Sequence, residues 1–323
     1  MTKLIVELCQ NHQGDRRILE RTVEDAAANG ADYVKIQSMF ADDLTTRDRF
    51  EEGEASPDGV VRAIKRPYAA EKQRLAPLDL TLDDHRWFID KCRECGVIAL
   101  TTIFARHRIA AVGSLPWPER VVKVASYDCA SWPMLEELAG YFDRFIISTG
   151  AMQDEEIVTT AELMRKLGKS FSFLHCVTSY PNTLDICHLA RMEWLRSLTP
   201  EVGWSDHTLV ERDGLTAAQV AIMLGADYVE RHITSIARSD TKDGPISISP
   251  AQLKTLDEFR RMTKEEQTAS VERTTPHWRT LLGDAHRPMS DVELLNRDYY
   301  RGRFASPDGS GAWIYNWQTV TRS

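Results

Sequence analysis

Short apolar runs rich in β-branched residues alternate along the chain with longer stretches in which apolar residues recur every three to four positions. The first pattern is typical of buried strands and the second of amphipathic helices. Runs of the strand type lie at residues 3–9, 33–38, 97–104, 121–126, 144–150, 171–177, 202–207 and 228–234. Strands and helices that alternate in this way favour repeated βα units on a parallel sheet.

Eight such runs predict a closed (β/α)₈ TIM barrel of the α/β class. An open doubly wound sheet is the alternative, but no G-x-G-x-x-G motif follows the first run, where ELCQNHQG stands. We expect a barrel domain over residues 1–266 and a short C-terminal extension over residues 267–323, which is aromatic and rich in arginine. Residues 41–80 interrupt the repeat as a long charged connection after the second strand.

Composition narrows the class of protein. The chain has 323 residues, of which 42% are hydrophobic and 27% charged, as is usual for a globular protein. Its net charge of -8 argues against nucleic acid or an anionic membrane surface as a partner. No apolar stretch has the length of a membrane span, so a cytoplasmic location is expected. Six dispersed cysteines predict reduced thiols, and the Cys92–Cys95 pair, inside a helical stretch, predicts a structural role.

Polar residues gather where the predicted strands end. In barrel enzymes the active site lies at the carboxyl ends of the strands, so polar side chains there are candidates for function. The candidates are Glu7, Lys35, Gln37, Thr102, Lys123, Ser126, Ser148, Ser205, His207, Glu230 and His232.

Two groups among these candidates suggest particular chemistry. A lysine inside a barrel strand points either into the barrel mouth or against the helices, and the mouth is favoured for Lys35 and Lys123. With the neighbouring serines they predict a cradle for phosphate and carboxylate groups. His207 and His232 end adjacent strands and are predicted to share a divalent metal ion, although a single histidine would more often be structural.

The motifs also resemble a known family. The segments ELCQNHQG, ADYVKIQ, TTIFAR, VVKVAS, ISTGAM, LHCVTSYP, VGWSDHT and ADYVERHIT follow, in order, the motifs of the sialic acid (N-acetylneuraminate) synthase family. The resemblance covers residues 3–260. It implies a transferase that condenses phosphoenolpyruvate with a sugar aldehyde, releasing phosphate and forming a 2-keto-3-deoxy sugar acid of the nonulosonic type.

The resemblance also implies roles for individual residues. His207 and His232 would bind Mn²⁺ or Mg²⁺, which would polarise the aldehyde. Phosphoenolpyruvate would be held by Lys35, Thr102, Lys123, Ser126, Ser148 and Ser205. The sugar or the attacking water would meet Glu7, Gln37, Thr178, Tyr180 and Asp243. Glu7 is the candidate general base. The alternative for Tyr180, which precedes a proline, is a role in packing. The alternative for Asp243 is a structural role in a turn.

The sugar side departs from the family pattern. Family members continue into a small antifreeze-like domain that contributes an arginine to the sugar site of a partner subunit, and residues 287–318 resemble the linker to it. Arg301 and Arg303 are candidates to replace that arginine, with a surface role as the alternative. Thr178 stands where an amide is common, and K-D-G-P replaces the usual G-P-D-H. A homodimer is expected from the family.

These departures leave the acceptor open between an N-acetylmannosamine-like hexose and another aldehyde, such as a modified sugar or a nucleoside. Two further alternatives remain. One is a non-catalytic barrel that serves as a binding or scaffold protein, which would have no need for both histidines and both lysines. The other is a metal-dependent aldolase or lyase that uses pyruvate, which would not need a phosphate cradle.

Overall fold

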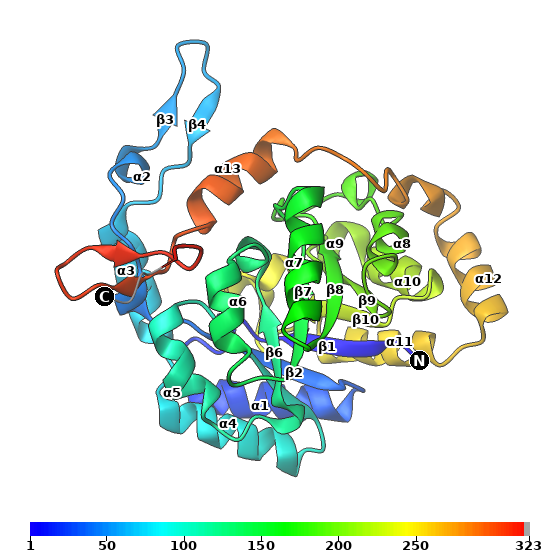
Figure 1. Cartoon of the computed structure of the whole chain (residues 1–323). Coiled ribbons are helices and arrows are strands. Elements are labelled where there is room, and N and C mark those ends of the chain that lie inside the picture. The colour runs from blue at the N-terminus through cyan, green and yellow to red at the C-terminus, as the bar shows by residue number, and fades with distance from the viewer. Residues whose placement is uncertain (320–323) are drawn as a thin grey trace.

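The barrel prediction is confirmed by the computed structural model, which describes residues 1–319 (Figure 1). Eight parallel strands close into a barrel in the order β1-β10-β9-β8-β7-β6-β5-β2. Each strand lies within one of the predicted runs or extends one residue beyond it. Their bounds are β1 (Lys3–Glu7), β2 (Tyr33–Ser38), β5 (Ile98–Ile103), β6 (Val121–Val124), β7 (Arg144–Ser148), β8 (Ser170–Cys176), β9 (Val202–Asp206) and β10 (Tyr228–His232).

Helices surround the barrel and follow its strands. They are α1 (Arg16–Ala28), α4 (Leu82–Glu94), α5 (Ile109–Gly113), α6 (Trp132–Leu138), α7 (Asp154–Lys166), α8 (Arg191–Arg196), α9 (Val210–Asp213), α10 (Thr216–Met223) and α11 (Pro250–Arg260). Local side chains fix several of their starts. The Asp15 carboxylate accepts a hydrogen bond from the backbone N–H of Arg17, while Thr81 and Ser249 form capping boxes at α4 and α11. Among residues 1–319, no helix combines the length and apolar character needed to cross a membrane.

Strand alternation divides the barrel interior into layers. The lower layer is apolar and is formed by Ile5, Tyr33, Leu100, Val121, Ile146, Leu174 and Tyr228. Gly203 lies at the corresponding position of β9. A Cβ atom there would lie 2.4 Å from the Tyr228 carbonyl oxygen, so the position requires glycine. Residues two positions further along each strand face the same side. They form the polar layer, which consists of Glu7, Lys35, Thr102, Lys123, Ser148, Cys176, Ser205 and Glu230.

Two segments outside the repeat meet above the polar layer. Residues 41–80 contain α2 (Arg49–Glu52), a hairpin of β3 (Glu54–Ala55) and β4 (Val61–Ala63), and α3 (Tyr68–Leu75). The C-terminal region contains α12 (Lys264–Thr274), α13 (Asp291–Tyr300), β11 (Ser306–Pro307) and β12 (Trp313–Ile314). The predicted domain border between residues 266 and 267 therefore falls inside α12. In Figure 1, α13 crosses over the barrel and brings the red C-terminal segment beside α3.

Backbone hydrogen bonds join these two segments. The N–H of Thr45 donates to the carbonyl of Arg303 at 2.9 Å, and the N–H of Ala305 donates to the carbonyl of Asp43 at 3.0 Å. Leu44 packs with Phe304 in a small apolar cluster. We refer to residues 41–80 together with residues 299–305 as the roof.

Candidate active site

A cavity of about 370 Å³ lies between the polar layer and the roof. Alternation aims the polar-layer side chains into it, and residues just beyond the strand ends form its upper walls. The structure brings all but one of the predicted site residues together here, namely Glu7, Lys35, Gln37, Thr102, Lys123, Ser126, Ser148, Tyr180, Ser205, His207, His232 and Asp243. This is the convergence that the strand-end pattern predicts.

Thr178 is the predicted site residue that does not line the cavity. Its side chain is fully buried, and its methyl group packs beside Gly150 in the loop after β7. Its carbonyl accepts a hydrogen bond from the side-chain amide of Asn296 in α13, at 2.7 Å. Strand alternation does not extend past the end of β8, so the direction of this side chain could not be predicted from the sequence pattern.

Lys35 occupies one side of the polar layer. Its Nζ forms an ion pair with Glu7 and lies 3.8 Å from Glu230 and 3.5 Å from the Thr102 hydroxyl. Burial opposes the charge, but the carboxylates of Glu230 and Glu7 outweigh it and raise the pKa of Lys35. Lys35 therefore carries its positive charge at neutral pH.

Lys123 occupies the other side. Its Nζ donates to the Ser148 hydroxyl at 2.6 Å and to the Val124 carbonyl at 3.0 Å, and it lies 3.9 Å from Glu230. Burial lowers the pKa of Lys123, and the positive charge of Lys35 adds to this effect. Two lysines thus share the polar layer with the carboxyl groups of Glu7 and Glu230.

Glu230 is a site residue to which the sequence assigned no role. Its Oε1 accepts a hydrogen bond from the Ser205 hydroxyl at 3.2 Å. Burial opposes ionisation of this carboxyl, but Lys123 and Lys35 outweigh burial and lower the pKa of Glu230. Its position two residues before His232 on β10 was the available signal, because it places both side chains in the barrel mouth.

Cys9, His232 and Asp243 form a compact group of possible metal ligands. One ligand atom of each lies within 4.8 Å of the others. The Nδ1 atom of His232 and the Oδ2 atom of Asp243 are buried without a hydrogen-bond partner in the described chain. Buried polar atoms normally have partners, and thiol, imidazole and carboxylate donors suit a borderline divalent ion. These residues therefore fit a metal ion.

Cys9 was not among the predicted ligands. It follows the end of β1 by two positions, and its backbone N–H donates to Glu7 Oε1 at 2.7 Å. Its φ angle of 44° lies in the left-handed region, which few residues other than glycine adopt. Such backbone strain is typical of functional positions.

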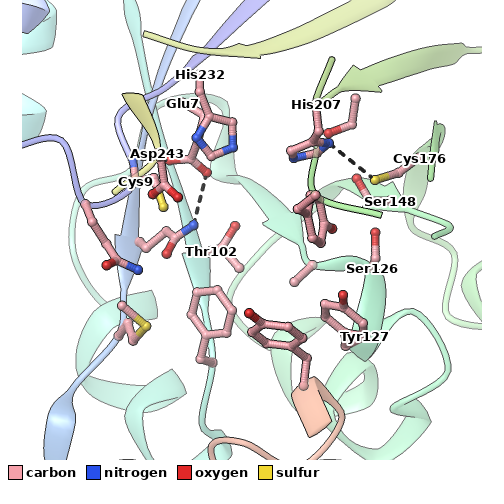
Figure 2. Close-up of a pocket in the computed structure, with 18 of the residues that line it drawn as sticks. Glu7, Cys9, Thr102, Ser126, Tyr127, Ser148, Cys176, His207, His232 and Asp243 are labelled. Carbon is pink, nitrogen blue, oxygen red and sulfur yellow. Dashed lines mark hydrogen bonds between the residues drawn. The ribbon is translucent and has the colours of Figure 1, made fainter. Parts of the chain in front are cut away.

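His207 lies next to this group but outside it. Its ring centroid is 5.2 Å from that of His232 and 4.6 Å from that of Tyr180, which meets it edge to face. Its Nδ1 lies 3.8 Å from the Cys176 sulfur, as the dashed line in Figure 2 marks. Burial lowers the pKa of His207 well below its usual range, and His232 adds to this effect. His207 thus offers a neutral imidazole at neutral pH.

The C-terminal segment contributes to the cavity directly. Arg303 lines it, together with Tyr300 and Phe304. Arg301 instead lies 3.4 Å from Glu156 of α7 and stacks on the Trp317 ring. Of the two arginines considered from the sequence, Arg303 is the one that reaches the cavity.

Glu71 of α3 holds two roof arginines. Its carboxylate lies 2.9 Å from Arg74 and 2.7 Å from Arg303. Burial opposes ionisation, but Arg74 and Arg303 outweigh it and lower the pKa of Glu71 to about 2. The ionised carboxylate is therefore favoured in the folded state.

We expect Glu71→Gln to remove a stabilising contribution that depends on pH. The contribution is present above the ordinary pKa of 4.5 and is lost as pH falls toward about 2, because the unfolded chain binds the proton first. At pH 7 the free energy of unfolding of the variant, measured by urea denaturation, should be about 2 to 3 kcal/mol lower than that of the wild type. At pH 3.5 the difference should be smaller. Glu162→Gln, on the exposed side of α7, is the control. Equal differences at both pH values would contradict the assignment.

Comparisons with known proteins agree with this architecture. Residues 22–271 match the model of the NeuB family. The chain is 28% identical over 267 residues to N,N'-diacetyllegionaminic acid synthase of Campylobacter jejuni, covering 79% of this chain and 74% of the relative. It is 28% identical over 256 residues to N-acetylneuraminate-9-phosphate synthase of Drosophila melanogaster, covering 78% of this chain and 65% of the relative.

A solved structure shares the fold. The N-acetylneuraminic acid (sialic acid) synthetase from Leptospira borgpetersenii superposes with a TM-score of 0.68 at 21% identity, covering 85% of this chain and 93% of that one. Because the family model spans more than half of the sequence, the chain belongs to the NeuB family.

Proposed function

We propose that the protein is a transferase that condenses phosphoenolpyruvate with a sugar aldehyde and releases phosphate. The product is a 2-keto-3-deoxy sugar acid of the nonulosonic type. The observation that carries this proposal is the polar layer, in which two buried lysines and several hydroxyls lie beside a thiol, imidazole and carboxylate group. The relatives' names support it, since those proteins are synthases of sialic and legionaminic acids.

The polar layer suits the two anionic groups of phosphoenolpyruvate. Lys35 and Lys123 supply positive charge, and the donors beside them are the hydroxyls of Thr102, Ser126, Ser148 and Ser205. A substrate held by fixed donors in a cavity shielded from water loses little further entropy on reaction. These residues would therefore orient C3 of the enol toward the acceptor.

The metal would be held by His232, Cys9 and Asp243, with His207 beside them. When bound, a divalent ion supplies a Lewis acid that polarises the aldehyde oxygen. Mn²⁺ or Mg²⁺ is the prediction from the family resemblance. A thiolate ligand favours manganese or a softer ion over magnesium.

In this proposal C3 of the enol bonds to the aldehyde carbon, whose oxygen takes a proton. Water then adds at C2, and the bond between C2 and the phosphate oxygen breaks, releasing phosphate and the keto acid. Glu7 is the candidate base for the proton of the attacking water. It lies in the polar layer, and Gln37 Nε2 donates to its carboxylate at 3.4 Å. Tyr180, which packs on His207, would line the sugar side.

Phosphate release from phosphoenolpyruvate tests the proposal. It should be measured with manganese across hexosamine, hexose, pentose and nucleoside aldehydes, with product masses determined. Release should require an acceptor and should be lost in His207→Ala, while the exposed His277→Ala should behave as the wild type. Tight binding of phosphoenolpyruvate without release for any acceptor would favour a scaffold protein. Turnover of pyruvate without competition by inorganic phosphate would favour an aldolase or lyase.

Cobalt loading tests the proposed thiolate ligand separately from activity. Co²⁺ bound to sulfur gives a near-ultraviolet charge-transfer band, so the loaded wild type should show one. Cys9→Ser should abolish the band and weaken Co²⁺ binding by at least about tenfold, because a soft donor is lost. Cys95→Ser, in a partly exposed position at the end of α4, should leave both unchanged. A band that persists in Cys9→Ser would exclude this thiol as a ligand.

The homodimer expected from the family also stays a prediction, which sedimentation analysis of the purified chain would test.

A further inference from the structure

Four basic side chains line the upper part of the cavity, and we call them the basic rim. They are Arg66, Arg74, Lys242 and Arg303. Arg66 and Arg74 come from the roof segment at 41–80, Lys242 from the loop after β10, and Arg303 from the C-terminal part of the roof. Three separate parts of the chain therefore direct positive charge into one space.

The rim holds more positive charge than its surroundings neutralise. Glu71 forms ion pairs with Arg74 at 2.9 Å and Arg303 at 2.7 Å. In the described part of the chain, Arg66 and Lys242 form no ion pair within 4.0 Å. The Arg303 side chain is only 9% exposed, and its Nε is a buried donor without a partner. Within 4.0 Å, Glu71 is thus the one carboxylate paired with these four cations in the described part of the chain, and Asp243 lies farther from Arg74.

The rim cations also affect each other. Arg74 and Arg303 both reach the carboxylate of Glu71, and the side chains of Arg66 and Lys242 line the same cavity. Crowding like charges in a partly buried space costs free energy unless an anion joins them. The arrangement therefore suits a bound anion.

The rim adjoins the proposed metal ligands. Lys242 directly precedes Asp243 in the chain. Arg74 donates a hydrogen bond to the side chain of Gln10, the residue after Cys9. The aromatic rings of Phe104, Tyr300 and Phe304 line the same part of the cavity. A molecule whose aldehyde lies at the metal ligands would therefore place a remote substituent at the rim.

We infer that the acceptor aldehyde carries a phosphate monoester, which the basic rim binds. This inference rests on the proposed function. Phosphate is favoured over a carboxylate because its dianion offers three oxygens to donors that converge from several directions, and arginine pairs with it through two hydrogen bonds. The relatives do not decide the matter, since their names include both a 9-phosphate product and a product without phosphate.

Matched pairs of aldehydes, with and without a terminal phosphate, test the inference. Hexosamines, hexoses and pentoses should be compared by consumption of phosphoenolpyruvate and by product mass. We expect the wild type to prefer one phosphorylated aldehyde over its neutral partner by at least about 100-fold in kcat/KM. Lys242→Met and Arg66→Gln should each raise the KM of that aldehyde at least about tenfold and leave the KM of phosphoenolpyruvate unchanged. Lys254→Met, an exposed lysine on α11, is the matched control.

The possible failures can be told apart. Equal turnover of neutral and phosphorylated aldehydes would overturn the inference and leave the proposed function standing. A rise in the KM of phosphoenolpyruvate in Lys242→Met would assign the rim to that substrate and also overturn it. If no aldehyde reacts, the proposed function fails. Binding of the same sugars, measured by calorimetry, then tests whether the basic rim binds a phosphate group. Binding of a phosphorylated sugar that requires Lys242 would support the inference, and no such binding would overturn it.

Discussion

Replacement of Lys123 by methionine is expected to lower kcat/KM for phosphoenolpyruvate by about 10²- to 10³-fold. The Lys123 side chain is 2% exposed, and its Nζ lies in the polar layer against Ser148. A charge held in a space shielded from water interacts more strongly with a phosphate than an exposed charge does. Methionine preserves much of the side-chain length but removes both the charge and the hydrogen bonds.

The matched control for this variant is Lys3→Met. Lys3 begins β1 at the opposite end of the barrel, where its Nζ approaches the Tyr33 hydroxyl at 3.5 Å. Residues at that end contribute to stability, whereas those at the carboxyl end act in catalysis. Steady-state kinetics at saturating acceptor should therefore separate the two variants. A loss of less than about threefold in Lys123→Met would show that this lysine is not part of the phosphoenolpyruvate site.

Replacement of Arg231 by methionine is expected to destabilise the fold by about 3 to 5 kcal/mol. Arg231 points outward from β10, between the side chains that face the cavity, and its guanidinium lies 2.7 Å from Asp206 of β9. Both side chains are at most 2% exposed. The substitution would leave a buried carboxylate without its counter-charge, which is more costly than the loss of the pair as a whole.

A double variant tests that explanation. Asp206 Oδ1 accepts hydrogen bonds from the N–H of Thr208 at 2.9 Å and from its hydroxyl at 2.8 Å, and an asparagine oxygen can accept both. Asp206→Asn combined with Arg231→Met should therefore unfold at a higher urea concentration than Arg231→Met alone. Equal stability of the single and double variants would show that the unpaired charge is not the cause.

The layered interior explains why much of the site could be predicted. A strand of known direction determines which side chains share a face, so Lys35 and Lys123 could be assigned to the barrel mouth from their positions within VKIQ and VVKVAS. Both line the cavity. The same rule covers residues just beyond a strand end less well, since the backbone is then free to turn. The Thr178 side chain packs beside Gly150 instead of entering the cavity, and the closeness of Asp243 to Cys9 depends on the path of the loop after β10.

The roof could not be predicted for a different reason. It depends on contacts between residues far apart in sequence. Neither segment has a periodic pattern that would indicate which other segment it packs against. Asp43 and Ala305 meet through backbone atoms, which leave no trace in the choice of side chain. The sequence identified both segments as departures from the repeat, but it did not show that Arg74 and Arg303 would share the carboxylate of Glu71.

The contact between the two roof segments affects how acceptor preference could change during evolution. The barrel strands come from consecutive βα units, whereas the roof, which would meet the acceptor under the proposed function, is divided between an early and a late stretch of the gene. A single crossover between two homologous genes would exchange one stretch without the other and would separate the side chain of Glu71 from that of Arg303. Preference for a new acceptor would therefore arise more readily by point changes within the roof than by recombination.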